Sequence, residues 1–384
     1  MTSNFNKKLG NSLKKVRETL GFTLEEVSQK MSFNNYQTLL SIEEGTRKLT
    51  AVELAMLAKI YLRDMTYFLN PEQRQEEEKL VVLWRACSGD NAYKLKEQEF
   101  LKYCDNYYDL EERLGIDHRF TLPQLDNMTA DDFTFERIRE IAAEYYNQML
   151  LGSRPACILE KVLEEKYNIK ILYLDLGTSG SAAAAIGKFG AAILSNSNEV
   201  LWRKNFNIAH ELFHIITWKN FDYKNIHIGG DEKSLIEKWA DAFASNLLLP
   251  QEEVTREFKN RIKNDKISLL DLIGIAREFI VSIDALLWRL ATLNLLEHNG
   301  VKNLLESEKV RELDKIQRVS DHTGNMPHIS VRYLNLAFKA YQNGFISKGK
   351  LAEYLGIDRF DVVKMLQQYG YAEEETYNEE LAIA

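Results

Sequence analysis

The clearest periodic segment of the chain runs from Arg203 to Trp218. At about 100° per residue, its polar and ligand-type side chains share an arc of roughly 100°, and apolar side chains cover most of the remaining surface. This pattern predicts a buried helix. The polar arc consists of Arg203, Asn207, His210, Glu211, His214 and Trp218, and the apolar surface of Phe206, Ile208, Ala209, Leu212, Phe213, Ile215 and Ile216.

Shorter patterns precede this helix. Residues 130–150 and 156–167 are expected to be helical, and the run at 169–174 predicts a strand. Apolar runs at 183–186 and 191–194, separated by two glycines, predict a hairpin. The central part of the chain is therefore expected to be an α+β unit.

The N-terminal segment has a different character, because short helical patterns fill residues 9–67. Thr23 and Glu26 have the spacing of a capping box, which opens a short helix. After a break at 32–34, a second helix is predicted over 35–44. The spacing is that of a helix-turn-helix.

Helices are also predicted for the charged segment 71–85 and for the aromatic segment 100–114. We expect both to connect domains and to support a homodimer, since helix-turn-helix domains usually read two half-sites. After Pro250 the chain is helical again, and residues 326–371 contain a second helix-turn-helix-like pattern. The acidic tail beside it argues against DNA contact there and favours a packing or partner-binding module. The predicted fold is α+β and mostly helical, with an all-α domain (1–70), a helical linker (71–128), a central α+β domain with a small sheet (129–300) and a helical C-terminal module with an acidic tail (301–384).

Composition and charge narrow the functional classes. The 384 residues are 45% hydrophobic and 28% charged, as in globular proteins, and no apolar run predicts a signal peptide or a membrane span. Cys87, Cys104 and Cys157 lack paired or metal-type spacing, which suits a reducing cytoplasm. Residues 1–70 carry a net charge of +3, whereas the whole chain carries −8, leaving −11 for the rest. Only the N-terminal part suits an anionic partner.

The candidate chemistry lies on the buried helix, in the His-Glu-x-x-His motif. His210 and His214, four residues apart, can bind one Zn²⁺, and Glu211 can handle the proton of an attacking water. The alternative is a core helix whose histidines bond to backbone carbonyls. A metzincin-type third ligand is excluded, because Thr217 and Asn220 occupy the positions of its glycine and histidine.

The third ligand is expected from a second amphipathic segment. Ile236, Ala240, Phe243 and Leu247 form its core stripe. Glu237 and Asp241 lie one turn apart along the edge of that stripe, so that Glu237 can bind the metal and Asp241 can accept the free ring N–H of a ligating histidine. Alternatively, Ser234 and Glu237 form a capping box that closes a helix N-terminus. The competing donors are Asp231, Glu232 and His227.

The stretch from Arg203 to Pro250 resembles the ImmA/IrrE family of bacterial and phage metallopeptidases. Its two blocks read Arg-x-x-Phe-x-x-Ala-His-Glu-x-x-His and Glu-x-x-Ala-Asp-x-Phe-Ala-x-x-Leu-Leu-x-Pro. The resemblance implies a zincin-like domain in which Glu237 is the third zinc ligand. Phe213 replaces a frequent glycine, and Asp241 in place of a frequent asparagine is closer to gluzincins generally. In such peptidases the strand before the active helix commonly offers its edge to substrate, so residues 191–195 are expected to bind peptide.

The N-terminal pattern is similar to that of XRE-family, Cro- and repressor-like DNA-binding domains. The matching positions are Leu13, Arg17, Thr23, Glu26, Ser28, Ile42, Glu43, Gly45, Arg47 and Leu49. The resemblance implies that the second helix enters the major groove. We expect base contacts from Gln37, Thr38 and Ser41, and phosphate contacts from Arg17, Arg47 and Lys48. Glu43 and Glu44 place negative charge nearby and favour the alternative, a module for protein contact.

Two functions are consistent with these patterns. The first is a cytoplasmic, DNA-binding zinc endopeptidase whose substrate, implied by the family resemblance, is a transcriptional repressor or similar regulator of phage, mobile-element or stress genes. The second is a non-proteolytic regulator or antitoxin whose zinc domain senses a ligand or partner. The glutamate of the motif favours the enzyme.

Overall fold

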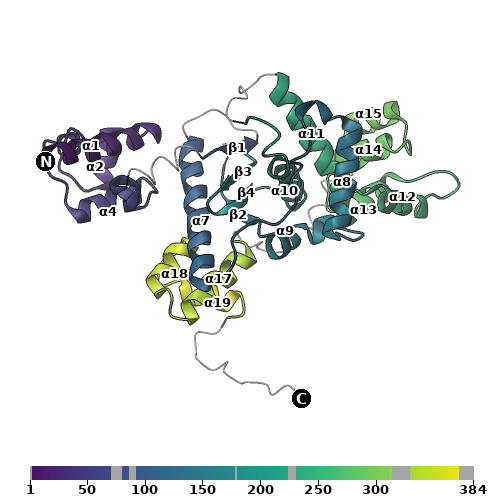
Figure 1. Cartoon of the computed structure of the whole chain (residues 1–384). Coiled ribbons are helices and arrows are strands. Elements are labelled where there is room, and N and C mark those ends of the chain that lie inside the picture. The colour runs from purple at the N-terminus through teal and green to yellow at the C-terminus, as the bar shows by residue number, and fades with distance from the viewer. Residues whose placement is uncertain are drawn as a thin grey trace, which may run out of the picture.

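A computed structural model of the chain describes residues 2–70, 80–85, 92–177, 180–223, 231–308, 310–313 and 329–371. The fold is mostly helical, with one small mixed sheet in the central part (Figure 1). The predicted α+β class is therefore confirmed. Within the described residues, no helix is long and apolar enough to cross a membrane.

The N-terminal helices form a bundle beside the rest of the molecule (Figure 1). They are α1 (Thr2–Thr19), α2 (Leu24–Lys30), α3 (Tyr36–Glu43), α4 (Ala51–Ile60) and α5 (Met65–Leu69). The capping box at Thr23 and Glu26 opens α2, and the Asn35 side chain caps α3. The bundle has its own core, to which Leu13, Val27, Leu39, Leu57 and Tyr61 belong.

The sheet has the strand order β1-β3-β4-β2. Its strands are β1 (Val82–Arg85), β2 (Lys170–Leu174), β3 (Ala182–Gly187) and β4 (Gly190–Asn196). The predicted hairpin is confirmed, since β3 and β4 pair antiparallel, and β2 pairs with β4 in parallel. The helix predicted over 71–85 is wrong at its end, where Val82–Arg85 pairs with β3 as a strand. Residues 71–79 lie outside the described part.

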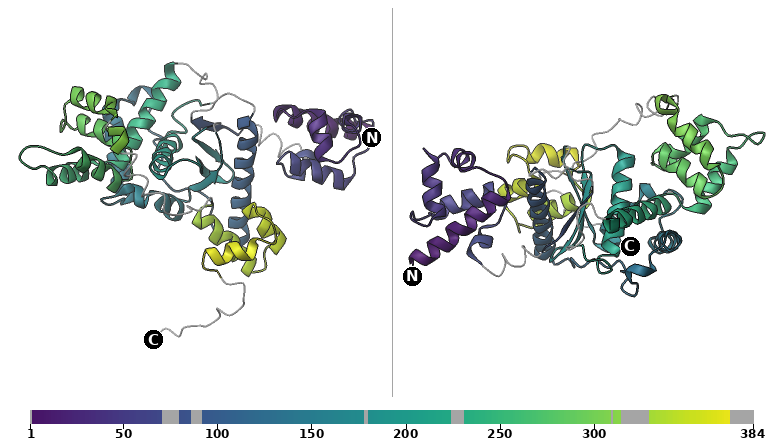
Figure 2. Two further views of the ribbon diagram at one scale, coloured as in Figure 1. Left: turned by 180° about the vertical axis from the view of Figure 1, so that it is seen from behind. Right: turned by 90° about the horizontal axis from the view of Figure 1, so that it is seen from above.

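Helices cover both faces of this sheet (Figure 2). On one face lie α9 (Leu159–Tyr167) and α10 (Leu201–Ile216); α11 (Asp231–Leu248) packs on α10, and α8 (Phe135–Met149) on α11, within the same core. On the other face lies α7 (Ala92–Leu114); α17 (Val331–Gln342) packs on α7, and α18 (Lys348–Leu355) and α19 (Val362–Gln368) complete that core. Alternate residues of β3 divide accordingly, with Ala184 in the first core and Ala183 in the second.

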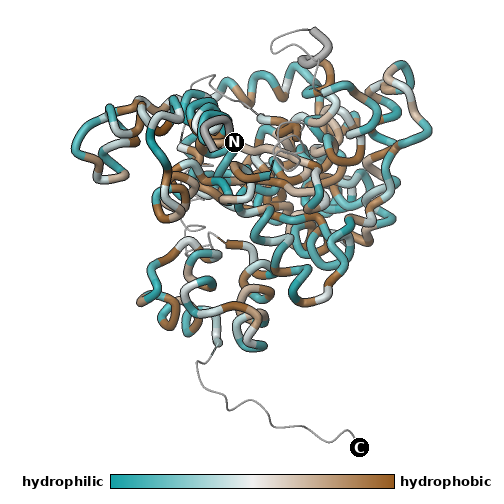
Figure 3. Tube along the Cα trace, turned by 60° about the vertical axis from the view of Figure 1, so that its left-hand side comes forward, coloured by the Kyte–Doolittle hydropathy of each residue, from teal (hydrophilic) through white to brown (hydrophobic). Residues whose placement is uncertain are grey.

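The remaining helices lie on the same side of the sheet as α8 and α11. Apolar residues are frequent in the packed interior of the molecule (Figure 3). They are η1 (Ala130–Asp132), η2 (Pro155–Cys157), α12 (Gln251–Asn260), α13 (Leu269–Glu278), α14 (Ile283–Thr292) and α15 (His298–Glu306). The buried stripe predicted for α11 is confirmed, since Ile236, Ala240, Phe243 and Leu247 are at most 2% exposed.

A buried polar network fastens the C-terminal helices to the second face. The ammonium of Lys170 on β2 lies 2.9 Å from Glu111 on α7, and the Arg332 guanidinium lies 3.0 Å from the same carboxylate. Tyr107 packs against Tyr333 with ring centroids 5.1 Å apart. The aromatic face of α7 is thus used within the chain, and the expected homodimer stays a prediction. The acidic tail at 373–380 lies outside the described residues.

Candidate metal centre

The amphipathic pattern of α10 buries its His-Glu-x-x-His motif deeply. His210, Glu211 and His214 are 1%, 1% and 3% exposed. Phe213 lies on the opposite, apolar side of α10, where its ring contacts Phe243 of α11. Burial of two imidazoles and a carboxylate is costly without compensating partners, so their surroundings decide what they do.

α11 brings a carboxylate to the two imidazoles. Glu237 lies 3.2 Å from His210 Nε2 through Oε2, and 3.7 Å from His214 Nε2 through Oε1. The two Nε2 atoms are 3.2 Å apart. One ligand atom from each of the three residues falls within 4.8 Å of the others. These three are therefore the candidate ligand set.

The position of Glu237 within α11 argues against the capping-box interpretation. The helix begins at Asp231, so Glu237 lies in its second turn and does not close the helix N-terminus. Of the competing donors, His227 lies outside the described residues, as do the side chains of Asp231 and Glu232.

Hydrogen bonds around the ligands determine which ring nitrogen carries the proton. His210 Nδ1 lies 2.9 Å from Asp241 Oδ1, and since an ionised carboxylate only accepts, Nδ1 holds the hydrogen. For His214 the argument runs through two hydroxyls. Thr217 donates to the Phe213 carbonyl at 2.7 Å, so Tyr223, 2.9 Å away, donates to Thr217. The Tyr223 oxygen then accepts from His214 Nδ1 at 3.2 Å.

In their neutral forms, both histidines therefore direct an Nε2 lone pair toward the same point. Two lone pairs 3.2 Å apart repel each other, and the nearby Glu237 carboxylate adds negative charge. A cation between the three groups removes this repulsion, and the donor set of two imidazoles and one carboxylate suits Zn²⁺. The residues present thus fit a metal ion.

Tyr223 and Thr217 were not identified from the sequence. Burial raises the pKa of Tyr223, so its hydroxyl stays protonated and can donate to Thr217 while its oxygen accepts from His214. Tyr223 follows α10 in a loop without a recognisable pattern, and Thr217 entered the sequence interpretation only by excluding another ligand scheme. No local signal indicated that the two hydroxyls meet.

The peptide edge expected at residues 191–195 is wrong. β4 is an inner strand, with Ile193 paired to Ala184 on one side and to Ile171 on the other. Its backbone groups are used in both directions, so no peptide can add there. Along the chain, β4 does directly precede α10, but chain order does not determine strand order in the sheet.

The structure of the N-terminal bundle contradicts one of the predicted DNA contacts. Arg17 is 7% exposed and bonds to Glu43 through Nε at 2.7 Å and Nη2 at 2.9 Å. The prediction that Arg17 holds a phosphate is wrong, because its guanidinium is committed inside the bundle. Glu43, 1% exposed, is neutralised by the same pair and does not present its charge to a partner. The charge conflict expected at α3 is thereby reduced to Glu44.

The other predicted DNA contacts lie at or near the surface of the bundle. Gln37 and Lys48 are exposed, and Thr38 and Ser41 are partly buried. The Ser41 hydroxyl donates to the Gln37 carbonyl at 2.7 Å. Arg47 is exposed, but its guanidinium lies 2.8 Å from Glu53. A phosphate contact by Arg47 therefore has to compete with this ion pair.

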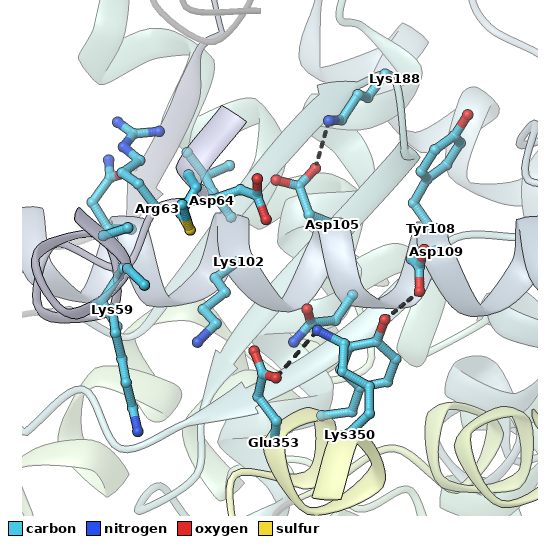
Figure 4. Close-up of a pocket in the computed structure, with 18 of the residues that line it drawn as sticks. Lys59, Arg63, Asp64, Lys102, Asp105, Tyr108, Asp109, Lys188, Lys350 and Glu353 are labelled. Atoms are coloured by element: carbon cyan, nitrogen blue, oxygen red, sulfur yellow. Dashed lines mark hydrogen bonds and ion pairs between the residues drawn. The ribbon is translucent and has the colours of Figure 1, made fainter. Parts of the chain in front are cut away.

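A polar cleft separates the bundle from the central part (Figure 4). Its volume is about 730 Å³, and it lies between α4 and α5 on one side and α7 and α18 on the other. Lys188 pairs with Asp105 at 3.1 Å, and Lys350 with Glu353 at 3.2 Å. The three candidate metal ligands do not line this cleft.

Comparison with known proteins bears on the centre alone. No curated protein matches the chain. Residues 164–291 match the family model described as IrrE N-terminal-like domain, Peptidase_M78, a stretch that includes all three candidate ligands. A metallopeptidase family implies a metal at this centre. The match supports the ImmA/IrrE family of metallopeptidases for this part of the chain.

Proposed function

We propose that the chain is a DNA-binding, regulatory zinc endopeptidase. Its substrate is a transcriptional repressor or similar regulator, whose cleavage controls phage, mobile-element or stress genes. The observation that carries the peptidase part is the convergence of His210, His214 and Glu237 within 4.8 Å, with Glu211 buried on the same helix face. The choice of substrate rests on the family resemblance.

Each residue of the centre has a defined task. Zn²⁺, when bound, polarises the scissile carbonyl and makes water a stronger acid. Glu211 accepts the proton of the attacking water and passes it to the departing amine. Asp241 and Tyr223 fix the two imidazoles in the tautomer that leaves Nε2 for the ligand role. His210, His214 and Glu237 would hold the ion, and three protein ligands are the number typical of catalytic zinc sites.

Charge and burial support a DNA contact by the bundle. Residues 1–70 carry +3 against −11 for the remainder, and Glu43 is internally neutralised. We propose that α3 enters the major groove, with Gln37 at the base edges and Arg47 and Lys48 near phosphates. Salt should therefore weaken binding steeply.

The alternative is a regulator whose zinc domain only senses a ligand or partner. Glu211 is the observation that distinguishes the two. A site that only holds a metal needs His210, His214 and Glu237, and has no use for a second, buried carboxylate beside them. The peptidase is the better supported function.

Metal analysis and DNA binding test the two halves separately. Purified chain should contain close to one zinc, and His214→Ala should lose most of it. In a binding assay across salt concentrations, Arg47→Ala should lower affinity and reduce the salt slope by about one, whereas Gln37→Ala should broaden sequence preference. Full zinc content in both His210→Ala and His214→Ala, or DNA binding that does not need residues 1–70, would contradict the respective half.

A further inference from the structure

β1 is the part of the sheet that the proposed function does not explain. It lies outside residues 164–291, the stretch that matches the peptidase family, and adds a fourth strand to β2, β3 and β4. It pairs antiparallel with β3, with Val82 opposite Ala185 and Arg85 opposite Ala182. Without β1, β3 would be an edge strand with a row of unpaired backbone donors and acceptors.

This edge of the sheet adjoins the metal-bearing face of α10. Asn207 donates from Nδ2 to the carbonyl of Ser181 at 3.3 Å. Ser181 directly precedes β3, and Asn207 lies one helical turn before His210. The end of β1 opposite Ala182 is therefore the end nearer to the candidate metal centre.

β1 is held mainly from the side of α7. The indole of Trp84 donates to Glu97 at 2.9 Å and packs edge-on against Tyr93 at a centroid distance of 6.1 Å. Val82 and Trp84 both pack on the second core, whereas Leu83 alternates to the α10 side opposite Ala184. β1 has only four residues, and two of its side chains, Val82 and Trp84, pack on the second core. Its displacement therefore breaks few contacts.

The position of β1 in the chain links it to the N-terminal bundle. It lies between α5, which ends at Leu69, and α7, which begins at Ala92. Of the described side chains of α7, Leu95 packs on the core of the bundle, and elsewhere the polar cleft of Figure 4 separates the two. The labelled pair of Lys188 and Asp105 lies wholly on the central side of that cleft. Among the residues that the structure describes, little apolar contact thus fixes the bundle relative to β1.

We propose that β1 is an autoinhibitory strand, which occupies in cis the edge of β3 where an extended substrate segment adds as an antiparallel strand. Strand addition to a sheet edge is a common way to bind an extended peptide. Access to the centre then requires displacement of β1, which a shift of the bundle on DNA or partner binding can supply. The inference rests on the proposed peptidase function.

The test uses the zinc-loaded full chain and a short peptide hydroxamate, a probe that combines a metal-binding group with an extended backbone. Trp84→Ala removes the anchor of β1 and should tighten hydroxamate binding about tenfold or more, together with faster hydrogen exchange of the β3 amides. Trp288→Ala, a partly exposed tryptophan on α14, is the matched control and should change neither.

A second variant fixes the strand in place. Leu83 and Ala184 are directly opposite across the two strands, so Leu83→Cys with Ala184→Cys can form a disulfide. Oxidation should weaken hydroxamate binding about tenfold or more, and reduction should restore it, whereas Leu83→Cys alone should not respond. Equal binding by locked and reduced zinc-loaded protein, or no tightening in Trp84→Ala despite faster exchange in β3, overturns the role of β1. Absence of zinc from every variant and from the wild type would instead remove the proposed peptidase and this role together.

Discussion

Replacing Tyr223 with phenylalanine removes the oxygen that accepts the His214 Nδ1 hydrogen at 3.2 Å and leaves the ring in place. The change therefore removes one hydrogen bond from a histidine that is 3% exposed. Loss of such an outer contact typically lowers metal affinity by about 10- to 100-fold. We therefore expect zinc affinity to fall by about 10- to 100-fold in Tyr223→Phe.

Competition with a chromogenic chelator measures this affinity directly. Tyr146→Phe is the control, because Tyr146 donates to the Gly152 carbonyl at an exposed site on another helix. Asp241→Ala, which removes the acceptor for His210 Nδ1, should show a loss of similar size. Zinc affinities of Tyr223→Phe and Asp241→Ala that both equal that of Tyr146→Phe would refute the tautomer argument.

Two further predictions concern buried charge. Arg17→Met leaves Glu43 buried without this ion-pair partner and should destabilise the bundle by about 3–5 kcal/mol. The loss should appear as faster hydrogen exchange within residues 2–70. An effect no larger than that of Arg47→Ala would contradict the importance of the buried pair. Burial raises the pKa of Glu164 to about 8, so the native state favours the protonated carboxyl and the free energy of unfolding should fall as pH rises from about 4.3 to 8. Urea denaturation of metal-free protein at pH 5 and 9 should show this fall, and its persistence in Glu164→Gln would assign it to another group.

The sequence was most informative where a short spacing carries the chemistry. The polar arc of α10 and the stripe of α11 each repeat with the period of a single helix, so the spacing of His210 and His214, and that of Glu237 and Asp241, followed from local geometry. The meeting of the two helices was implied by the family resemblance. Such periodicity needs no knowledge of the remaining chain. The hairpin of β3 and β4 was predictable for the same reason.

The misses involve partners that are distant in sequence. Arg17 matched a DNA-binding pattern, but its role depends on Glu43, 26 residues away on another helix. The strand β1 pairs with residues about a hundred positions later, and its four residues are too few to show a period. Tyr223 lies in a loop, where no repeat indicates which side chains turn inward.

Glu211→Gln provides the most direct test of the proposed peptidase, because the change is nearly isosteric and leaves the candidate ligands His210, His214 and Glu237 intact. The variant should keep zinc and DNA binding but lose cleavage, so it should retain an uncut regulator that can be captured from host cells. Wild-type protein should then cut that captured regulator. Identical transcriptional regulation by wild type and Glu211→Gln, with no fragment of any captured protein, would contradict the peptidase and favour the sensor.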